Sequence, residues 1–428
     1  MAVQIVKKGE RKRPAGKKAE ELKVYDSAPE KTGGGIGGFL SFLFPIGKEN
    51  KLKLELIKEL FSKSELDELK SLLRSHKVRF AEESFSTTHD FFPDSKYLVL
   101  ASNSINRRIK ERIEFLNRRV REFEREKVFI KFSSIAEEKI GSMIAHNIIG
   151  MDAVKRAGLL QLFASEKVHI LLLGDPSTGK TAVLRSIADL APISSFGLGS
   201  GSSKAGLTIT FAGKEMIKGI LPSADGGIAC IDELNLLKGV DRAGLLNAME
   251  KGSITYDKGN NHVQVDARVK VFASANPDGD KFVGNTIDVL RNQVPFEQAL
   301  LSRFHLVFLI RRPSTEEFLR ITENIIKGER KSLDPSNVSF VKEYISFALK
   351  RGVEFDKSLG AMIQGFVQDA RKDEEKFLVE ISPRTVTGMI NMAKASARLR
   401  LAAKVDKGDI IKVLKIFNEA LYVKREPR

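Results

Sequence analysis

The sequence predicts a parallel α/β fold joined to an all-helical C-terminal part, on three observations. First, the apolar run 170–173 ends abruptly in a glycine-rich loop, and helical spacing follows the loop. Second, further strand candidates at 227–232, 269–276 and 305–310 alternate with helical segments, which is typical of a parallel sheet. Third, the apolar spacing after Pro313 is helical to the end of the chain.

Composition limits the classes of protein that the chain can belong to. Cys230 is the single cysteine among 428 residues, which excludes an intramolecular disulfide and argues against a zinc site. We therefore expect a reducing, cytoplasmic location, nucleoid-associated in a prokaryote. No stretch reaches the ~18 apolar residues of a spanning helix, so no membrane partner is expected. The net charge of +16 suits a nucleic-acid partner, and it equally suits a lysine-rich surface that keeps the protein soluble.

Changes in composition along the chain predict four parts. Residues 1–35 are rich in lysine and arginine and end in three glycines, which predicts a flexible basic tail. Residues 36–132 carry leucines at helical spacing and predict a small, mainly helical region. The strand and helix alternation defines a core at 133–313, and 314–428 is expected to form a helical lid.

The loop after the first strand has the pattern G-x-x-x-x-G-K-T, which cradles phosphates in nucleotide-binding proteins. Lys180 is placed to reach the β and γ phosphates of ATP, and the Thr181 hydroxyl to bind Mg²⁺. The strand before the loop and the helix after it favour this interpretation over a chance match in an ordinary turn. The predicted nucleotide-binding residues are Gly174, Asp175, Pro176, Ser177, Thr178, Gly179, Lys180 and Thr181.

Polar residues follow two later strands. Asp232 and Glu233 end the strand 227–232, at the edge where parallel sheets place site residues. Asp232 would hold Mg²⁺ through water, and Glu233 would polarise the attacking water as general base. Asn276 follows the next strand and would orient that water. Taken alone, the acidic pair could cap a helix, and Asn276 with its proline could be a turn.

Two arginines stand where an anion would be expected. Arg303 lies just before the last strand, where ring-forming ATPases present an arginine to the γ-phosphate held by a neighbouring subunit. Ser382 is suited to cap a helix whose first turn contains Pro383, so Arg384 would lie at a helix N-terminus. The helix dipole disfavours a cation there, which indicates an anionic partner such as phosphate.

Taken in order, GDPSTGKT, GGIACIDE, SANP, LLSRF and SPRTV resemble the AAA+ core of the minichromosome maintenance (MCM) replicative helicase family. The segments 150–163, 201–208 and 249–268 also resemble that family, and the similarity extends from about Ser133 to the C-terminus. The resemblance implies a P-loop NTPase fold in which subunits form a homo-oligomer, a hexameric ring, on DNA.

The resemblance also implies roles for individual residues. Lys258, near the tip of a hairpin, would contact DNA phosphate, although a solvated hairpin lysine is the simpler interpretation of that residue alone. Arg303 and Arg384 would act on ATP held by the adjacent subunit. The residues acting within the same subunit would be Lys180, Thr181, Asp232, Glu233 and Asn276.

The chain also departs from the family pattern. Few strand signals precede Ser133, so the family's N-terminal zinc and oligonucleotide-binding module is expected to be absent or replaced. The segment 207–218 is short where the family often has a helical insertion, and Lys251 and His305 replace a usual glutamine and aspartate. The leading hypothesis is an ATPase that translocates on, unwinds or remodels DNA. The alternatives are a MoxR- or chelatase-like ATPase that remodels proteins, and a ring subunit that binds ATP and DNA without acting as a motor.

Overall fold

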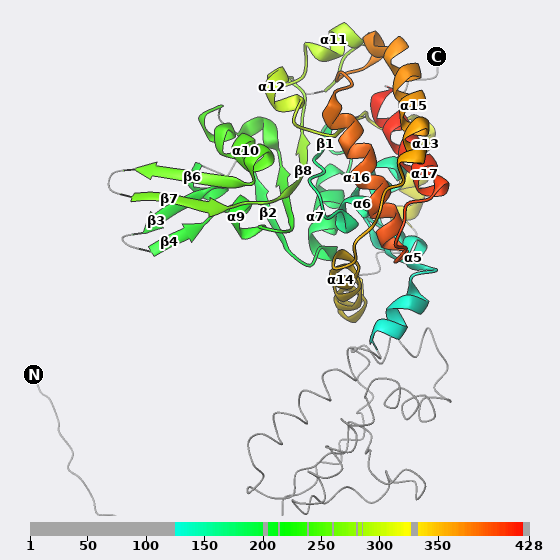
Figure 1. Ribbon diagram of the computed structural model, residues 1–428. Helices are drawn as coiled ribbons and strands as arrows, with labels where there is room; N and C mark the ends of the chain where they lie inside the picture. Colours follow the sequence, from blue (N-terminus) through cyan, green and yellow to red (C-terminus); the bar gives the residue numbers. More distant parts are fainter. Residues whose placement is uncertain are drawn as a thin grey trace, which may run out of the picture.

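The computed structural model describes an α/β layer structure with a helical C-terminal part, so the predicted fold class is confirmed (Figure 1). No helix in the described portion is both long and apolar enough to cross a membrane. The predicted tail and almost all of the predicted N-terminal helical region lie outside the described residues. The described residues are 125–199, 204–212, 215–237, 239–258, 261–279, 281–284, 286–326 and 333–422.

A five-stranded parallel sheet forms the centre of the structure, and four of its strands occupy the predicted positions. The strand that the sequence did not reveal lies at one edge of the sheet, and most of its residues are half-buried. It contains two serines and a glycine. The first strand along the chain lies in the middle of the sheet, between two strands that follow much later. In spatial order the strands are β2 (Ser194–Leu198), β5 (Ile228–Asp232), β8 (Lys270–Ala275), β1 (Ile170–Gly174) and β9 (Leu306–Ile310).

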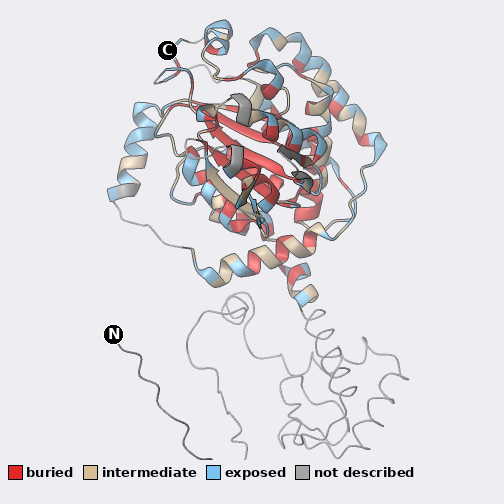
Figure 2. Ribbon diagram, turned by 90° about the vertical axis from the view of Figure 1, so that its left-hand side faces the viewer, coloured by how far each residue is buried: buried red, intermediate tan, exposed pale blue. Residues whose placement is uncertain are grey.

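Successive side chains of the strands face two separate hydrophobic cores, as the pleat of a strand requires. Ile170 and Leu172 belong to one core, and Leu171 and Leu173 belong to the other. Figure 2 shows the buried sheet between helices whose outer faces are exposed. Residues of α5 (Ala136–Met143), α6 (Asp152–Phe163), α7 (Lys180–Leu190), α14 (Pro335–Leu349), α16 (Pro383–Leu399) and α17 (Lys407–Leu421) line the first core.

The second core is covered by shorter helices and carries two hairpins. Its covering elements include α8 (Lys204–Leu207), α9 (Ile220–Ser223), α10 (Gly239–Lys251) and α12 (Gln298–Leu301). Further helices are α11 (Ile287–Arg291), α13 (Thr315–Ile326), α15 (Gly360–Lys372) and three short 3-10 turns at 234–236, 357–359 and 374–376.

The two antiparallel hairpins project together from the sheet (Figure 1). One pairs β6 (Ser253–Lys258) with β7 (Asn261–Asp266), at the place where the family resemblance implied a hairpin. The other pairs β3 (Ile209–Ala212) with β4 (Glu215–Lys218), so the short segment 207–218 forms a hairpin. The hairpins touch through the rings of Phe211 and Tyr256, whose centroids lie 5.2 Å apart.

Cys230 lies in β5 and is fully buried in the first core. Burial raises the pKa of its thiol far above the usual value. Because the reactive species of cysteine is the thiolate, this thiol is unreactive, and the side chain acts as a small core residue.

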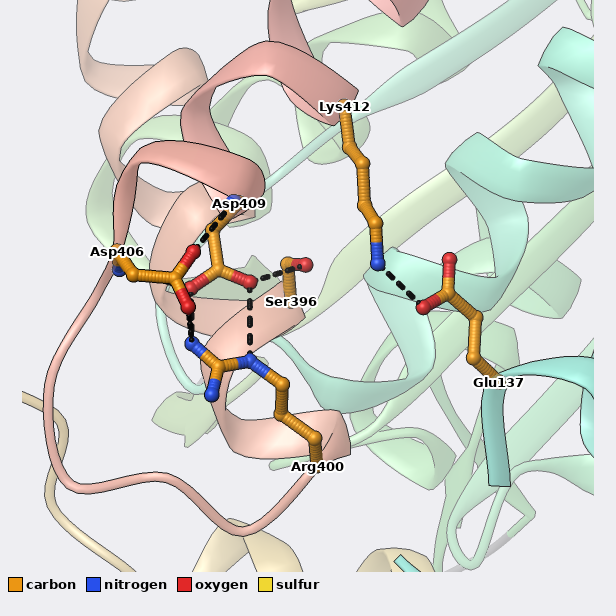
Figure 3. A network of polar contacts seen from close by, with 6 residues as sticks. All are labelled: Glu137, Ser396, Arg400, Asp406, Asp409 and Lys412. Carbon is orange, nitrogen blue, oxygen red and sulfur yellow. Dashed lines mark hydrogen bonds and ion pairs between the residues drawn. The ribbon is translucent and has the colours of Figure 1, made fainter. Parts of the chain in front are cut away.

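Two C-terminal helices begin with side-chain caps, and a charged network joins one helix to the other. Ser382 and Thr385 form a capping box at the start of α16, and Pro383 lies in the first turn of this helix. The predicted cap and the predicted position of the proline are thus confirmed. At the start of α17 the carboxylate of Asp409 is only 1% exposed and accepts hydrogen bonds from Ser396 and from Arg400, at 2.7 Å for the closest contact (Figure 3). This network ties the end of α16 to the start of α17.

Replacing Arg400 with alanine is expected to lower the free energy of unfolding by about 2 kcal/mol, because a buried carboxylate loses its charged partner. The matched control is Lys412→Ala, which removes an ion pair to Glu137 whose side chains are 47% and 48% exposed. That pair should contribute less than about 0.5 kcal/mol. Chemical denaturation of both variants measures the difference, and equal losses would contradict a special role for the Asp409 network.

Candidate nucleotide site

The loop after β1 has the backbone conformation that a phosphate cradle needs. Gly179, directly before α7, has φ 92°, and Ser177 has φ 63°, so both residues occupy the left-handed region. No side chain caps the N-terminus of α7, whose first backbone N–H groups are therefore suited to an anion. Gly174 has a different reason to be glycine: a Cβ there would collide with the carbonyl oxygen of Ile310 in β9.

Lys180 lies inside this loop, and its side chain is buried. Its Nζ donates to the backbone oxygens of Gly174, at 2.7 Å, and Asp175, at 2.6 Å. Burial lowers the pKa of Lys180 to about 8, while the carboxylates of Asp175 and Asp232 act in the opposite direction. The ammonium group is therefore still mostly protonated at neutral pH and can pair with phosphate. Thr181, the next residue, is exposed on the first turn of α7.

The side chain of Asp175 fixes the loop through two hydrogen bonds to other parts of the chain. One carboxylate oxygen accepts a hydrogen bond from the backbone N–H of Phe282 at 2.8 Å, and the other accepts from the backbone N–H of Arg312 at 3.1 Å. The residue is 4% exposed. Its side chain thus joins the loop to the segment after β8 and to the end of β9, which is a supporting role beside the phosphate contact that the motif predicts.

Replacing Asp175 with asparagine should lower the free energy of unfolding by about 2 kcal/mol. The asparagine oxygen can accept from one of the two backbone N–H groups, but its NH₂ group is a donor and leaves the other N–H without an acceptor. Weaker ATP binding should accompany the loss, because the loop is no longer held at both sides. Asp189→Asn on the exposed face of α7 is the matched control. Denaturation and nucleotide titration measure both effects, and identical behaviour of the two variants would exclude the support by Asp175.

The two predicted carboxylates lie at the same edge of the sheet as the loop. Asp232 ends β5, is 4% exposed and accepts a short hydrogen bond from the hydroxyl of Ser274 in β8. The backbone N–H of Glu233 lies 3.1 Å from the same carboxylate oxygen. Glu233 has φ 54°, an unusual conformation for a residue with a side chain, and such strain is found most often at functional sites.

Asn276 follows β8 at the same edge, next to the end of β5. Its backbone N–H donates to the side-chain oxygen of Asn235 at 3.0 Å. Asn235 lies in the turn directly after Glu233. The structure thus brings Lys180, Asp232, Glu233 and Asn276 to one edge of the sheet, which we call the carboxyl edge.

The two predicted arginines lie at the opposite edge, where β1 and β9 begin. Arg303 follows α12 and precedes β9, whose first residue Leu306 pairs with Ile170 of β1. Arg384 donates through Nη1 to the backbone oxygen of Ser302 at 2.6 Å, which places both arginines together. Burial lowers the pKa of Arg384, and the charge of Arg303 lowers it further. We call this the amino edge of the sheet.

Two buried histidines lie near Arg384 at the amino edge. The backbone N–H of His169 donates to Nδ1 of His305 at 2.9 Å, so that nitrogen carries no proton. Burial, and then the charge of Arg384, lower the pKa of His305 to about 4, and burial and His305 lower the pKa of His169. Both rings are therefore neutral at physiological pH. His305 fills the place where the family pattern has aspartate.

Lys258 is the last residue of β6 and pairs with Asn261 of β7, so it lies next to the tip of the hairpin. Its backbone position agrees with the one that the resemblance implied. The side chain of Lys258 and the rest of the tip lie outside the described residues.

Three residues of the site were not identified from the sequence. Ser274, the partner of Asp232, could have been found, because it is a polar residue inside an apolar strand. Asn235 had no such signal, since it lies in a turn, where a single polar residue is ordinary. Glu250 pairs with Arg303 at 2.8 Å, and a contact between residues so far apart in the chain has no local pattern.

Comparison with known proteins gives a consistent result for most of the described chain. The family model described as the MCM P-loop domain matches residues 126–328, and the MCM AAA-lid domain matches residues 339–421. The chain is 30% identical over 325 residues to DNA replication licensing factor mcm7 of Schizosaccharomyces pombe, covering 68% of this chain and 42% of the relative.

Two further relatives lead to the same family. The chain is 29% identical over 305 residues to DNA replication licensing factor mcm7 of Xenopus tropicalis, covering 65% of this chain and 42% of that relative. It is 27% identical over 345 residues to DNA replication licensing factor MCM4 of Arabidopsis thaliana, covering 74% and 40%. The chain thus spans less than half the length of these curated relatives.

Proposed function

This chain belongs to the MCM family of AAA+ ATPases, and we propose that it forms a homo-oligomeric, hexameric ring in which ATP hydrolysis drives movement along DNA, unwinding of DNA or remodelling of DNA. One observation supports the proposal most strongly: the two groups of site residues lie at opposite edges of one sheet. β1 has five residues, and at about 3.3 Å per residue it separates the edges by roughly 15 Å. The arginines therefore cannot reach the nucleotide loop of their own subunit.

The carboxyl edge would bind ATP and activate water. Lys180 and the N-terminus of α7 would bind the phosphates. Mg²⁺, held by Thr181 and through water by Asp232, would neutralise part of the phosphate charge. Glu233 would take a proton from the water that attacks the γ-phosphorus, and Asn276 would orient that water, so that ADP and phosphate leave.

The amino edge would complete the site of the next subunit. Arg303 and Arg384 would stabilise the charge that develops on the transferred phosphoryl group. A head-to-tail contact of this kind, repeated with a rotation that closes, generates a ring. The histidines near Arg384 are neutral, so they neither offset the positive charge of the arginines nor titrate at physiological pH.

DNA is proposed as the partner because the relatives are named as DNA replication licensing factors and because the chain has a net charge of +16. The β6–β7 hairpin begins directly after α10 and projects from the sheet, so it could contact a polymer in the middle of a ring (Figure 1). A role in DNA replication and an intracellular, cytoplasmic location follow from the same proposal.

Replacing Lys258 with alanine tests the proposal. Single-stranded and forked DNA should stimulate ATP turnover of the assembled wild-type protein. The variant should bind DNA more weakly and should show a salt dependence of binding reduced by about one phosphate contact. Turnover measured with and without DNA at several salt concentrations gives both quantities.

The control is Lys404→Ala, which removes an equal charge at a 74% exposed position in the C-terminal part. It should leave DNA stimulation at the wild-type level. If DNA leaves the turnover of the wild-type protein unchanged, the DNA motor is excluded, and a protein-remodelling ATPase becomes the better hypothesis. Negligible turnover after assembly would favour a ring subunit that is not a motor.

A further inference from the structure

Glu250 connects the arginine pair to the β6–β7 hairpin. Its Oε2 lies 2.8 Å from Nη2 of Arg303, and the two side chains are 52% and 25% exposed. Arg303 also donates through Nη1 to the backbone oxygen of Ala299 at 3.2 Å, whereas its buried Nε has no hydrogen-bond partner. Glu250 is therefore the carboxylate that holds the Arg303 guanidinium in the described structure.

The surroundings of Glu250 carry an excess of positive charge. Lys167 donates through Nζ to the backbone oxygen of Glu250 at 2.7 Å. Burial lowers the pKa of Lys167, and the nearby charge of Arg384 lowers it further, while Glu250 raises it. Arg303, Arg384 and Lys167 thus lie near one carboxylate, of which Arg303 is the ion-pair partner. An additional anion at this edge would be stabilised.

Glu250 also lies at the start of the hairpin. It belongs to the last turn of α10, which ends at Lys251, and β6 begins at Ser253. The backbone N–H of Ala267, just after β7, donates to the oxygen of Gly252 at 2.8 Å, so the end of α10 is attached to both strands. A displacement of Glu250 would therefore be transmitted to the hairpin through only two residues, Lys251 and Gly252.

We propose that Glu250 is a positioning residue that couples the ATP site of the neighbouring subunit to the β6–β7 hairpin. Without a γ-phosphate within reach, Glu250 holds Arg303. When the neighbour's γ-phosphate arrives, it competes for the same guanidinium, and the end of α10 with its hairpin is released. The exchange is feasible because a half-exposed ion pair in water is weak, whereas a phosphate carries more charge. This inference rests on the proposed action of Arg303 between subunits.

Amide hydrogen exchange of the assembled full-length protein tests the coupling without DNA. The two samples compared contain Mg²⁺ and ADP, either alone or with beryllium fluoride as a mimic of the γ-phosphate. In the wild-type protein, beryllium fluoride should change the exchange rates of β6 and β7 amides by about twofold or more. In Glu250→Gln this response should be lost, while the response of the loop 174–181 remains.

Two controls separate coupling from a structural effect. Glu250→Asp keeps the charge and should retain at least part of the hairpin response. Asp266→Asn removes a 66% exposed carboxylate from the same hairpin, away from Arg303, and should respond as the wild type does. Thermal unfolding of all three variants shows whether the fold is intact.

The response of the loop and the response of the hairpin have separate consequences. A response at the loop but none at the hairpin of the wild type overturns the coupling alone, and so does a hairpin response that persists in Glu250→Gln. Absence of any response at the loop overturns both the coupling and the proposed ATPase. A hairpin response together with ATP turnover that DNA leaves unchanged supports the coupling and rejects DNA as the partner.

Discussion

Replacing Arg303 with alanine is expected to slow ATP turnover of the assembled protein by about 10³-fold or more, because an arginine that stabilises transition-state charge contributes this much in related phosphoryl transfers. ATP binding should change much less, since the variant leaves Lys180 and the nucleotide loop of every subunit intact. Turnover and nucleotide titration measure the two properties separately. Arg156→Ala is the matched control: it removes another arginine that pairs with a glutamate, at 3.5 Å on the surface of α6.

Mixing two inactive proteins tests the assignment between subunits. Arg303→Ala lacks the arginine but has an intact loop, and Lys180→Ala has the opposite defect. In a random equal mixture about one interface in four joins an intact loop to an intact arginine, so turnover should recover to at most about a quarter of the wild-type rate. If mixed oligomers form and no ratio of the two proteins restores turnover, the arginine does not act on the neighbouring subunit.

Replacing Glu233 with glutamine should reduce turnover by about 10²–10⁴-fold while ATP still binds, because the variant keeps the shape of the side chain and loses the proton acceptor. The left-handed backbone of Glu233 and its N–H contact with Asp232 remain possible for glutamine, so the thermal stability should not change. Single-turnover kinetics with bound ATP measure the chemical step directly. A loss of less than about tenfold would show that another group acts as general base.

The positions of the main elements could be predicted because each one has a local cause. The strands at 170–173 and 227–232 are apolar on both faces, as strands buried between two helix layers must be, and the loop between β1 and α7 requires glycine at fixed places. The cap of α16 could be predicted for the same reason, since Ser382 and Pro383 act on the backbone directly beside them. The roles of the site residues remain predictions that the experiments above address.

The features that escaped prediction depend on contacts between distant parts of the chain. β2 contains serines and a glycine, and only its pairing with β5 makes it a strand. The pair of Arg303 and Glu250 joins residues 53 positions apart, and its partners look like ordinary surface charges in the sequence. The support of the loop by Asp175 also comes from backbone N–H groups more than a hundred residues away.

The burial of Cys230 has a practical consequence for following the hairpin. It is the single cysteine of the chain, and it lies in the core with a thiol that stays protonated. Maleimide reagents require an accessible thiolate, so the folded wild-type protein should remain unlabelled. A cysteine introduced in place of the exposed Lys251 would then take up a fluorophore at one defined place without removal of the native residue. Fluorescence could thus record, in real time, how this part of the molecule responds to nucleotide.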